Sequence, residues 1–219
     1  MELINLHTHQ YTNASDVLEV VNQYPMEFDA NIPWYSIGLH PWKIDENTME
    51  TELAFVKTKL QEDNCLALGE CGLDKRTTVP FDLQLIAFEK QLQLAQRFNK
   101  PVIIHCVAAF QEVIAMKNRL GITVPMIIHG FSKTQELAKQ LTDHGFYISF
   151  GKYLLRNPEL EIVFKSIPNN RFFLETDTIE EGINEVYAKA AACKKINLDE
   201  LKQLININFQ TVFRNRTVK

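Results

Sequence analysis

Residues 101–131, PVIIHCVAAFQEVIAMKNRLGITVPMIIHGF, place two short apolar runs on either side of a helical pattern. Val102–His105 and Met126–His129 carry consecutive apolar residues, which is typical of a parallel strand buried on both faces. The segment Ala108–Arg119 between them fits a helix. A strand, a helix and a second strand form the repeating unit of α/β folds. Here each of the two strands ends in a histidine.

The same alternation extends along the rest of the chain. Eight such runs with helical patterns between them predict an α/β fold, specifically a (β/α)8 TIM-type barrel, with a doubly wound open sheet as the alternative. The expected strands are Glu2–Leu6, Val17–Asn22, Tyr35–Leu39, Cys65–Gly69, Val102–His105, Met126–His129, Phe146–Phe150 and Arg171–Glu175.

Helices are expected in most intervals between these strands. An amphipathic pattern follows Pro80, and both Ser132–Gln135 and Asn197–Glu200 have the spacing of a capping box. The expected helices are Glu46–Glu62, the segment from Phe81 to Ala95, Ala108–Arg119, the segment from Ser132 to about Asp143, Asn157–Ser166 and Leu198–Phe213.

The chain is short for such a barrel. It has 219 residues, whereas the usual barrel has ~250. Only Gln10–Asp16 separates the first two expected strands, and Gln23–Trp34 contains two prolines. We therefore expect a short, distorted barrel with a helix-poor first third. No linker composition divides the sequence, so a single domain over residues 1–219 is predicted.

Composition and charge exclude several classes of protein. The hydrophobic fraction is 46% and the formal net charge is −4, which excludes wholesale disorder and a generally basic nucleic-acid-binding coat. No apolar run approaches the ~18 residues of a membrane span. The four cysteines form no C-x-x-C pair and no signal-peptide pattern is present, so we expect a reduced, cytoplasmic protein. No feature indicates an obligate protein partner.

Most of the histidines lie at or just beyond the carboxyl end of an expected strand. In a barrel these ends converge on the face that carries active sites. His7 and His9 are two residues apart, so on an extended backbone they point the same way, ~7 Å apart, and can close on one metal ion. The sixth histidine, His144, is expected to cap a helix end. The residues that converge are His7, His9, His40, Glu70, His105, His129 and Asp177.

These positions belong to motifs that resemble those of the TatD family of metal-dependent hydrolases, within the amidohydrolase superfamily. The motifs follow the family order and cover nearly the whole chain. They are INLHTH at Ile4–His9, GLHPW at Gly38–Trp42, GECGLD at Gly69–Asp74, PVIIHC at Pro101–Cys106, IIHGF at Ile127–Phe131, GFYISF at Gly145–Phe150 and LETD at Leu174–Asp177.

The resemblance implies a binuclear metal centre with up to two divalent ions per chain. His7, His9 and Asp177 would hold one ion, His105 and His129 would hold the second, and Glu70 would bridge them. Imidazole with carboxylate suits Zn or Mn, whereas carboxylate and water alone would suit Mg.

The function expected from this resemblance is hydrolysis of a phosphodiester by a metal-activated water, in the manner of a deoxyribonuclease. Asp177 and Glu70 are the expected catalytic residues, with Asp177 taking the proton of the water. The substrate would be DNA or a small phosphodiester. Two alternatives stay open: an amidohydrolase acting on an amide, ester or lactone, and a metal-stabilised binding protein without turnover.

Residues beside the expected ligands are candidates for supporting roles. His40 could contact the substrate or a metal ligand, or it could fix a turn. Lys75 with Arg76 could bind a phosphate group or be solvated. Glu175 could support a metal-binding histidine or pair with Arg171. Trp34 and Trp42 are expected to pack in the core or at its rim, with base stacking as the alternative. These assignments are interpretations of position along the chain.

The sequence departs from the family pattern on the substrate side. Asn5 occupies a position where an aspartate is usual, and the segment after His105 has no arginine. The segment after Asp177 is short and has no basic or Asn-Glu-Pro-containing loop. The expected metal ligands are all present.

Overall fold

Eight strands form where the sequence predicts them, and they follow one another in the sheet in sequence order. The computed structural model describes residues 2–213. Several strand ends differ from the prediction: β1 and β5 each continue two residues further, to Thr8 and Val107, and the fourth strand continues through Glu70 to Asp74. The strands are β1 (Leu3–Thr8), β2 (Val17–Gln23), β3 (Tyr35–Ile37), β4 (Cys65–Asp74), β5 (Val102–Val107), β6 (Met126–Ile128), β7 (Tyr147–Phe150) and β8 (Phe172–Leu174).

Helices fill most of the intervals, and the first third of the described chain is helix-poor, as predicted. Between β1 and β3 the only helix among the described residues is the short 3-10 helix η1 (Pro25–Glu27). Two helices, α5 and α7, were not expected. The helices are α1 (Met49–Lys59), α2 (Phe81–Phe98), α3 (Phe110–Leu120), α4 (Gln135–Asp143), α5 (Lys152–Arg156), α6 (Pro158–Ser166), α7 (Ile183–Lys194) and α8 (Leu198–Phe213).

The capping predictions are confirmed at one helix and corrected at another. Asn197 and Glu200 exchange side-chain-to-backbone hydrogen bonds of 3.0 and 2.9 Å, as a capping box requires. At α4 the cap is Thr134 and not Ser132, because the Thr134 side chain accepts a hydrogen bond from Leu137 N. His144 ends the same helix, and its Nδ1 lies 2.8 Å from Gln140 O.

The chain divides into two compact units. Unit 1 comprises the described residues of Met1–Val21 and Ile128–Lys219, and unit 2 comprises Asn22–Ile127. Two strands, β2 and β6, cross a boundary between the units along the chain. The single domain over residues 1–219 stays a prediction.

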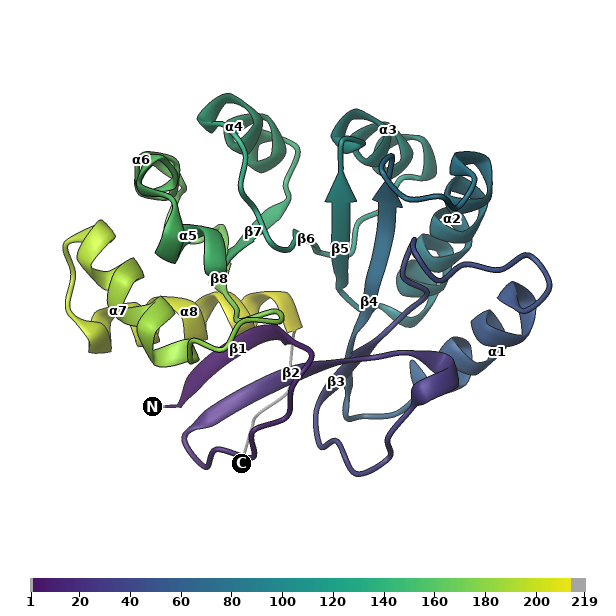
Figure 1. The fold of residues 1–219 in the computed structure, drawn as a ribbon, viewed down its shortest axis with the longest axis horizontal. Helices are drawn as coiled ribbons and strands as arrows, with labels where there is room; N and C mark the ends of the chain where they lie inside the picture. Colours follow the sequence, from purple (N-terminus) through teal and green to yellow (C-terminus); the bar gives the residue numbers. More distant parts are fainter. Residues whose placement is uncertain (1, 214–219) are drawn as a thin grey trace. The chain divides into compact units, whose positions relative to one another are not determined.

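Unit 1 brings the first strand against the last third of the chain. β1 pairs in parallel with β2, β7 pairs in parallel with β8, and a parallel bridge joins Thr8 to Asp177. Figure 1 shows α7 and α8 beside β1, and both helices contact that strand. The buried Tyr187 hydroxyl of α7 accepts from Ile4 N at 3.0 Å and donates to Ile4 O at 3.1 Å. These hydrogen bonds hold β1 against α7.

The interior of unit 1 contains a chain of aromatic rings. Phe131 contacts Phe150, Phe150 contacts Phe164, and Phe164 contacts Phe172, with centroids 4.9–5.8 Å apart and near-perpendicular planes. Edge-to-face pairs at this separation add to the burial energy of the rings. They pack the segment after β6 and the helix α6 against β7 and β8.

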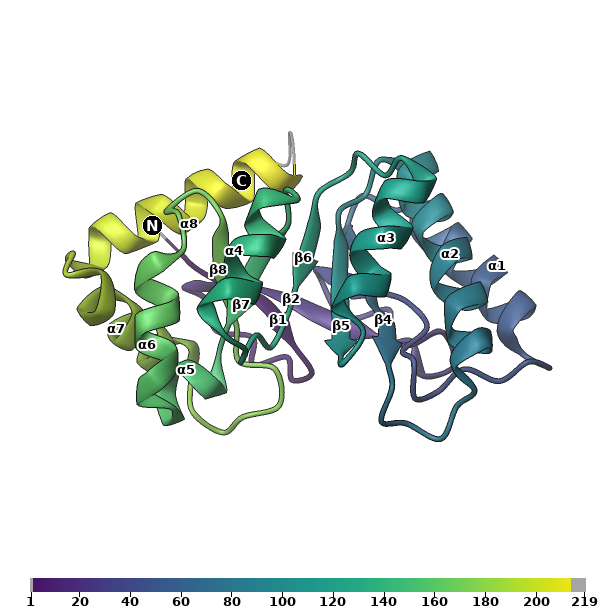
Figure 2. The same ribbon diagram turned by 90° about the horizontal axis from the view of Figure 1, so that it is seen from above.

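Unit 2 contains the parallel pairs β3–β4 and β4–β5. Figure 2 shows α2 and α3 beside these strands, and α2 contacts β4 while α3 contacts β5. At Gly72, whose φ is +142°, an added Cβ would lie 2.0 Å from the His105 carbonyl oxygen. Glycine is therefore required for β4 to approach β5 at the level of His105.

Two buried glutamines of α2 hold the strand ends of unit 2. Gln84 Oε1 accepts from Asp74 N at 2.8 Å, and its Nε2 donates to Asp74 O at 3.0 Å. Gln91 makes the same pair of contacts with the backbone of Leu39, at 2.8 and 3.2 Å. The backbone groups beyond β3 and at the end of β4 are thereby satisfied by side chains, as buried polar groups require.

Candidate metal centre

Three ligand-type side chains meet in unit 1 at the ends of β1, β6 and β8. His7, His129 and Asp177 each offer a donor atom, and these atoms lie within 4.8 Å of one another. The rings of His7 and His129 have centroids 4.4 Å apart, and Asp177 Oδ1 lies 3.8 Å from His7 Nε2. Two imidazoles and a carboxylate at this spacing can hold a divalent transition metal.

His9 joins the same cluster. Its Nε2 lies 3.5 Å from Asp177 Oδ1, and its ring is nearly perpendicular to that of His7 at a centroid distance of 5.2 Å. Both imidazoles of the His-x-His pair therefore approach one carboxylate, as the extended backbone of β1 implies.

The backbone of Asp177 is joined directly to the histidine pair. Asp177 N donates to His7 O and His9 N donates to Asp177 O, both at 3.0 Å. Asn5 strengthens the same junction, because its Oδ1 accepts from Thr176 N at 3.0 Å and its Nδ2 donates to Thr176 Oγ1 at 2.9 Å. The amide at position 5 thus positions the residue before Asp177.

The Asp177 carboxylate is also paired with a lysine. Burial opposes ionisation, but His7, His129 and Lys152 together hold the pKa of Asp177 below its usual range. Lys152 Nζ lies 2.9 Å from Asp177 Oδ2. Burial disfavours the ammonium, yet the contact with Asp177 raises the pKa of Lys152 above its usual value. Both groups are therefore charged at neutral pH.

Glu175 lies beside His129. Its Oε1 accepts from Gly130 N at 2.7 Å and lies 3.5 Å from His129 Nδ1. Arg171, the other partner considered for Glu175, instead lies over the Tyr147 ring at 5.0 Å. Glu175 is completely buried, and its Oε2 makes no hydrogen bond within the described part of the chain.

A second cluster lies in unit 2 and consists of His40, Glu70 and His105, whose donor atoms also lie within 4.8 Å of one another. Glu70 Oε1 lies 3.1 Å from His40 Nε2 and 3.0 Å from His105 Nδ1. Trp42 N donates to His40 Nδ1 at 3.1 Å. A neutral His40 therefore carries its proton on Nε2 and donates it to Glu70. This geometry makes His40 a support for Glu70.

Asp74 belongs to the same cluster, although sequence reasoning did not select it. Its Oδ2 lies 3.1 Å from His105 Nε2 and accepts from Trp42 Nε1 at 2.6 Å. Burial raises the pKa of this carboxyl, but hydrogen bonds from Trp42, Arg76 N and His105 lower it below its usual value. Asp74 lies four residues after Glu70 on β4, so the period of a strand places both on one face. That spacing was the available signal.

The two cations after β4 have different surroundings. The Lys75 ammonium pairs with Glu112 of α3. Arg76 is placed by its backbone, because its N donates to Asp74 Oδ1 at 2.8 Å. The structure therefore brings the Lys75 side chain to α3 and the Arg76 backbone to Asp74.

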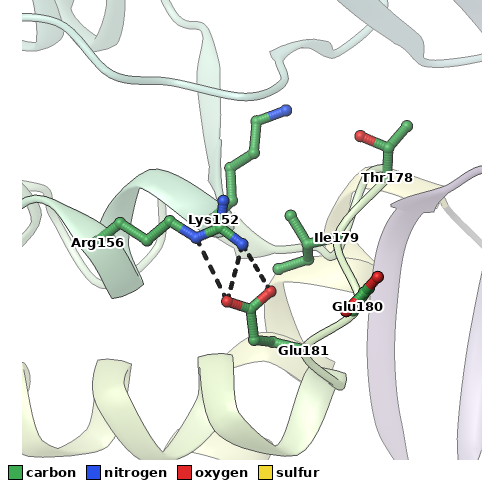
Figure 3. Close-up of a pocket in the computed structure, with 6 residues that line it drawn as sticks. All are labelled: Lys152, Arg156, Thr178, Ile179, Glu180 and Glu181. Atoms are coloured by element: carbon green, nitrogen blue, oxygen red, sulfur yellow. Dashed lines mark hydrogen bonds and ion pairs between the residues drawn. The ribbon is translucent and has the colours of Figure 1, made fainter.

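A pocket of about 610 Å³ lies between α5 and the segment that follows Asp177 in the chain (Figure 3). Arg156 of α5 binds Glu181 through Nη2 at 2.8 and 2.9 Å, and the Lys152 side chain extends away from that pair (Figure 3). The pocket is lined by Lys152, Arg156, Thr178, Ile179, Glu180 and Glu181.

The chain is similar to curated proteins, and it spans less than two thirds of the length of several of them. The chain is 28% identical to the uncharacterized metal-dependent hydrolase YabD of Bacillus subtilis over 214 residues, which cover 90% of this chain and 81% of that protein. It is 32% identical to a 3'-5' ssDNA/RNA exonuclease TatD of Enterobacter lignolyticus, over 66% of this chain and 57% of that protein.

Solved structures confirm the fold class. A TatD homologue of Escherichia coli, YJJV, aligns with a TM-score of 0.79 at 23% identity, over 90% of this chain and 86% of that one. The prediction of a (β/α)8 barrel is therefore confirmed. Among residues 2–213, no helix combines the length and the apolar character that crossing a membrane demands.

The fold and these relatives define a metal-dependent hydrolase of the (β/α)8 class. The family model for TatD related DNase matches residues 1–214, so the chain belongs to the TatD family.

The side chains fit the metal that this family implies. Both clusters combine imidazole with carboxylate, and donor atoms within each lie close enough to share an ion.

Proposed function

We propose that the protein hydrolyses phosphodiester bonds in DNA or smaller nucleotide esters with divalent metal ions. The observation that carries this proposal is the convergence of His7, His129 and Asp177 within 4.8 Å at three strand ends. Membership of the TatD family and a relative named a 3'-5' ssDNA/RNA exonuclease support the phosphodiester substrate.

The proposed ligands are those implied by the family motifs, with up to two ions per chain. Four of the six ligands belong to unit 1, and the other two, Glu70 and His105, belong to unit 2. The bridging role of Glu70 stays a prediction. Zn and Mn match the imidazole-rich set better than Mg does. The ligands are His7, His9, Glu70, His105, His129 and Asp177.

When bound, the metal ions supply Lewis acidity and stabilise negative charge that develops on the phosphoryl oxygens. The residues of the chain hold the ligands in place and accept or donate protons. Asp177 is ionised and can accept a proton from the attacking water. His40 donates to Glu70, and Glu175 approaches His129 Nδ1, so each holds a ligand in place.

Lys152 gives Asp177 a specific orientation. Because Lys152 Nζ lies 2.9 Å from Oδ2 and the histidines face Oδ1, the two carboxylate oxygens have different partners. Lys152 also lines the pocket between α5 and the segment after Asp177, which offers room for part of the substrate. Lys75 and Arg76 remain proposed phosphate contacts, although Lys75 would have to leave Glu112 to make one.

The test is an assay of the purified protein with Zn, Mn or Mg on single-stranded DNA, a generic phosphodiester and a panel of acyl esters, with metal content measured on the same samples. Metal-dependent cleavage of the phosphodiesters is expected. Turnover of the acyl panel alone would establish the amidohydrolase alternative, and metal binding without any turnover would establish the binding protein.

A cytoplasmic location is part of the same proposal. All four cysteines are buried and none of them forms a disulfide, which agrees with a reducing compartment. Burial and the nearby Glu70 carboxylate raise the pKa of Cys71 well above its usual value, so this thiol is kept protonated and unreactive.

A further inference from the structure

One large aromatic side chain beside the unit 2 cluster is exposed and yet firmly held. Trp42 follows β3, and 60% of it is accessible to solvent. The nearby apolar residues Pro41 and Ile44 are buried, so they do not extend the exposed indole into an apolar surface patch. A single exposed apolar side chain needs no explanation by itself, but this one is anchored at two points.

The anchors connect Trp42 to both sides of the Glu70–His105 pair. Its backbone N donates to His40 Nδ1 at 3.1 Å, and its indole Nε1 donates to Asp74 Oδ2 at 2.6 Å. Asp74 in turn contacts His105. The position of the indole is therefore determined by the same hydrogen bonds that orient the proposed ligands.

The ring contacts of Trp42 are edge-to-face. Its plane makes angles of 80° and 76° with the rings of His40 and His105, at centroid distances of 4.9 and 5.5 Å. Neither histidine is stacked on the indole. The adjacent Lys43 is engaged elsewhere, since its Nζ lies 3.1 Å from Glu27 Oε1 and 3.7 Å from the centroid of Tyr24. The exposed indole can therefore accept a planar partner face to face.

We propose that Trp42 is a stacking platform for a nucleobase of the substrate, and that it positions the adjoining phosphodiester at the Glu70–His105 pair. This inference rests on the proposed function and names the substrate class as one that carries nucleobases. Stacking is tolerant of base identity because every base has a π-face. Rigid anchoring favours it, because an indole that is already fixed loses little conformational entropy on binding.

Two substitutions separate the ring from its hydrogen bond. Trp42→Phe and Trp42→Leu both remove the donor to Asp74, but only Trp42→Phe keeps an aromatic surface. The substrates are a short oligothymidylate and an abasic tetrahydrofuran oligomer of the same length, which share one phosphodiester backbone. We expect Trp42→Leu to lower kcat/KM on oligothymidylate relative to Trp42→Phe, mainly through KM, by about 5- to 150-fold. On the abasic oligomer the two variants should be equal.

Equal losses on both oligomers would overturn the proposal and leave Trp42 as a structural support for Asp74. A wild-type protein that cleaves neither oligomer refutes the proposed phosphodiesterase activity, and fluorescence then decides the role of Trp42. Oligothymidylate should quench wild-type protein and Trp34→Phe but not Trp42→Phe, and the abasic oligomer should quench none. Identical responses to the two oligomers, or no response at all, would again overturn the stacking role.

Discussion

Asp177→Asn is the most informative substitution, because the two oxygens of this carboxylate face different partners. Oδ1 lies 3.8 Å from His7 Nε2 and 3.5 Å from His9 Nε2, and Oδ2 lies 2.9 Å from Lys152 Nζ. An asparagine has one oxygen and one amide nitrogen, so whichever way it turns, one side loses its acceptor. The substitution also removes the negative charge that can accept a proton.

The magnitudes of the two losses differ. A general base contributes ~10²–10⁴-fold to the rate, which corresponds to about 3–5 kcal/mol of activation free energy. A hydrogen bond to a charged group contributes ~1.5–3 kcal/mol to stability. The Lys152 side chain is 26% exposed, so we expect solvent to reduce that loss to roughly 1–2 kcal/mol. Catalysis should therefore suffer more than the fold.

Lys152→Met is the matched control. It breaks the same ion pair but keeps the carboxylate, so its stability should fall by a similar amount while most of its activity remains. Single-turnover kinetics, chemical denaturation and metal content should be measured on the same preparations. Near wild-type turnover in fully metallated Asp177→Asn would remove Asp177 from the proton transfer, and equal rate losses in both variants would reassign its role to the ion pair.

Three further outcomes are expected. Asp74→Asn should weaken metal binding by ~10–100-fold, because a buried carboxylate would no longer orient His105. Competition with a chromogenic chelator measures this affinity, and an unchanged affinity would show that the contact is incidental. Chelation should lower the melting temperature, since a ligand at ~100 times its Kd adds ~2.7 kcal/mol; calorimetry that shows equal melting with and without metal would contradict this. Tyr187→Phe should cost about 1–3 kcal/mol in denaturant unfolding, because it removes both hydrogen bonds to the Ile4 backbone; an unaltered midpoint would mean that β1 does not depend on that hydroxyl.

The positions of the elements were largely predictable because the information is local. Runs such as Val102–His105 are apolar on both faces, and no other secondary structure of that length fits them. The missed helix α7 is preceded by Gly182, which offers no side-chain cap, so its start had no signal. At α4 two hydroxyl residues, Ser132 and Thr134, precede the helix, and only the backbone conformation decides which one is the cap.

The site was predictable as a set of residue types at strand ends, and not as a set of contacts. The convergence of His7 with Asp177 follows from the parallel bridge that joins Thr8, at the end of β1, to Asp177, which follows β8. The contact between Asp74 and His105 depends on the register between β4 and β5, in which Asp74 lies opposite Val107. The indole hydrogen bond from Trp42 depends on the path of a loop. Neither the strand register nor the path of the loop can be read from the spacing of residues along the chain.

The interleaving of distant segments in unit 1 has a consequence for synthesis. Asn5 and Thr176 are separated by 171 residues yet hold each other by side-chain and backbone hydrogen bonds. At ~5–20 residues per second, the ribosome needs roughly 10–35 s to add the second partner after the first. During that interval the His-x-His pair has left the ribosome without its carboxylate, whereas Asn22–Ile127 is already complete. The nascent chain must therefore keep β1 from pairing elsewhere, or from capturing a metal ion, until its final third arrives.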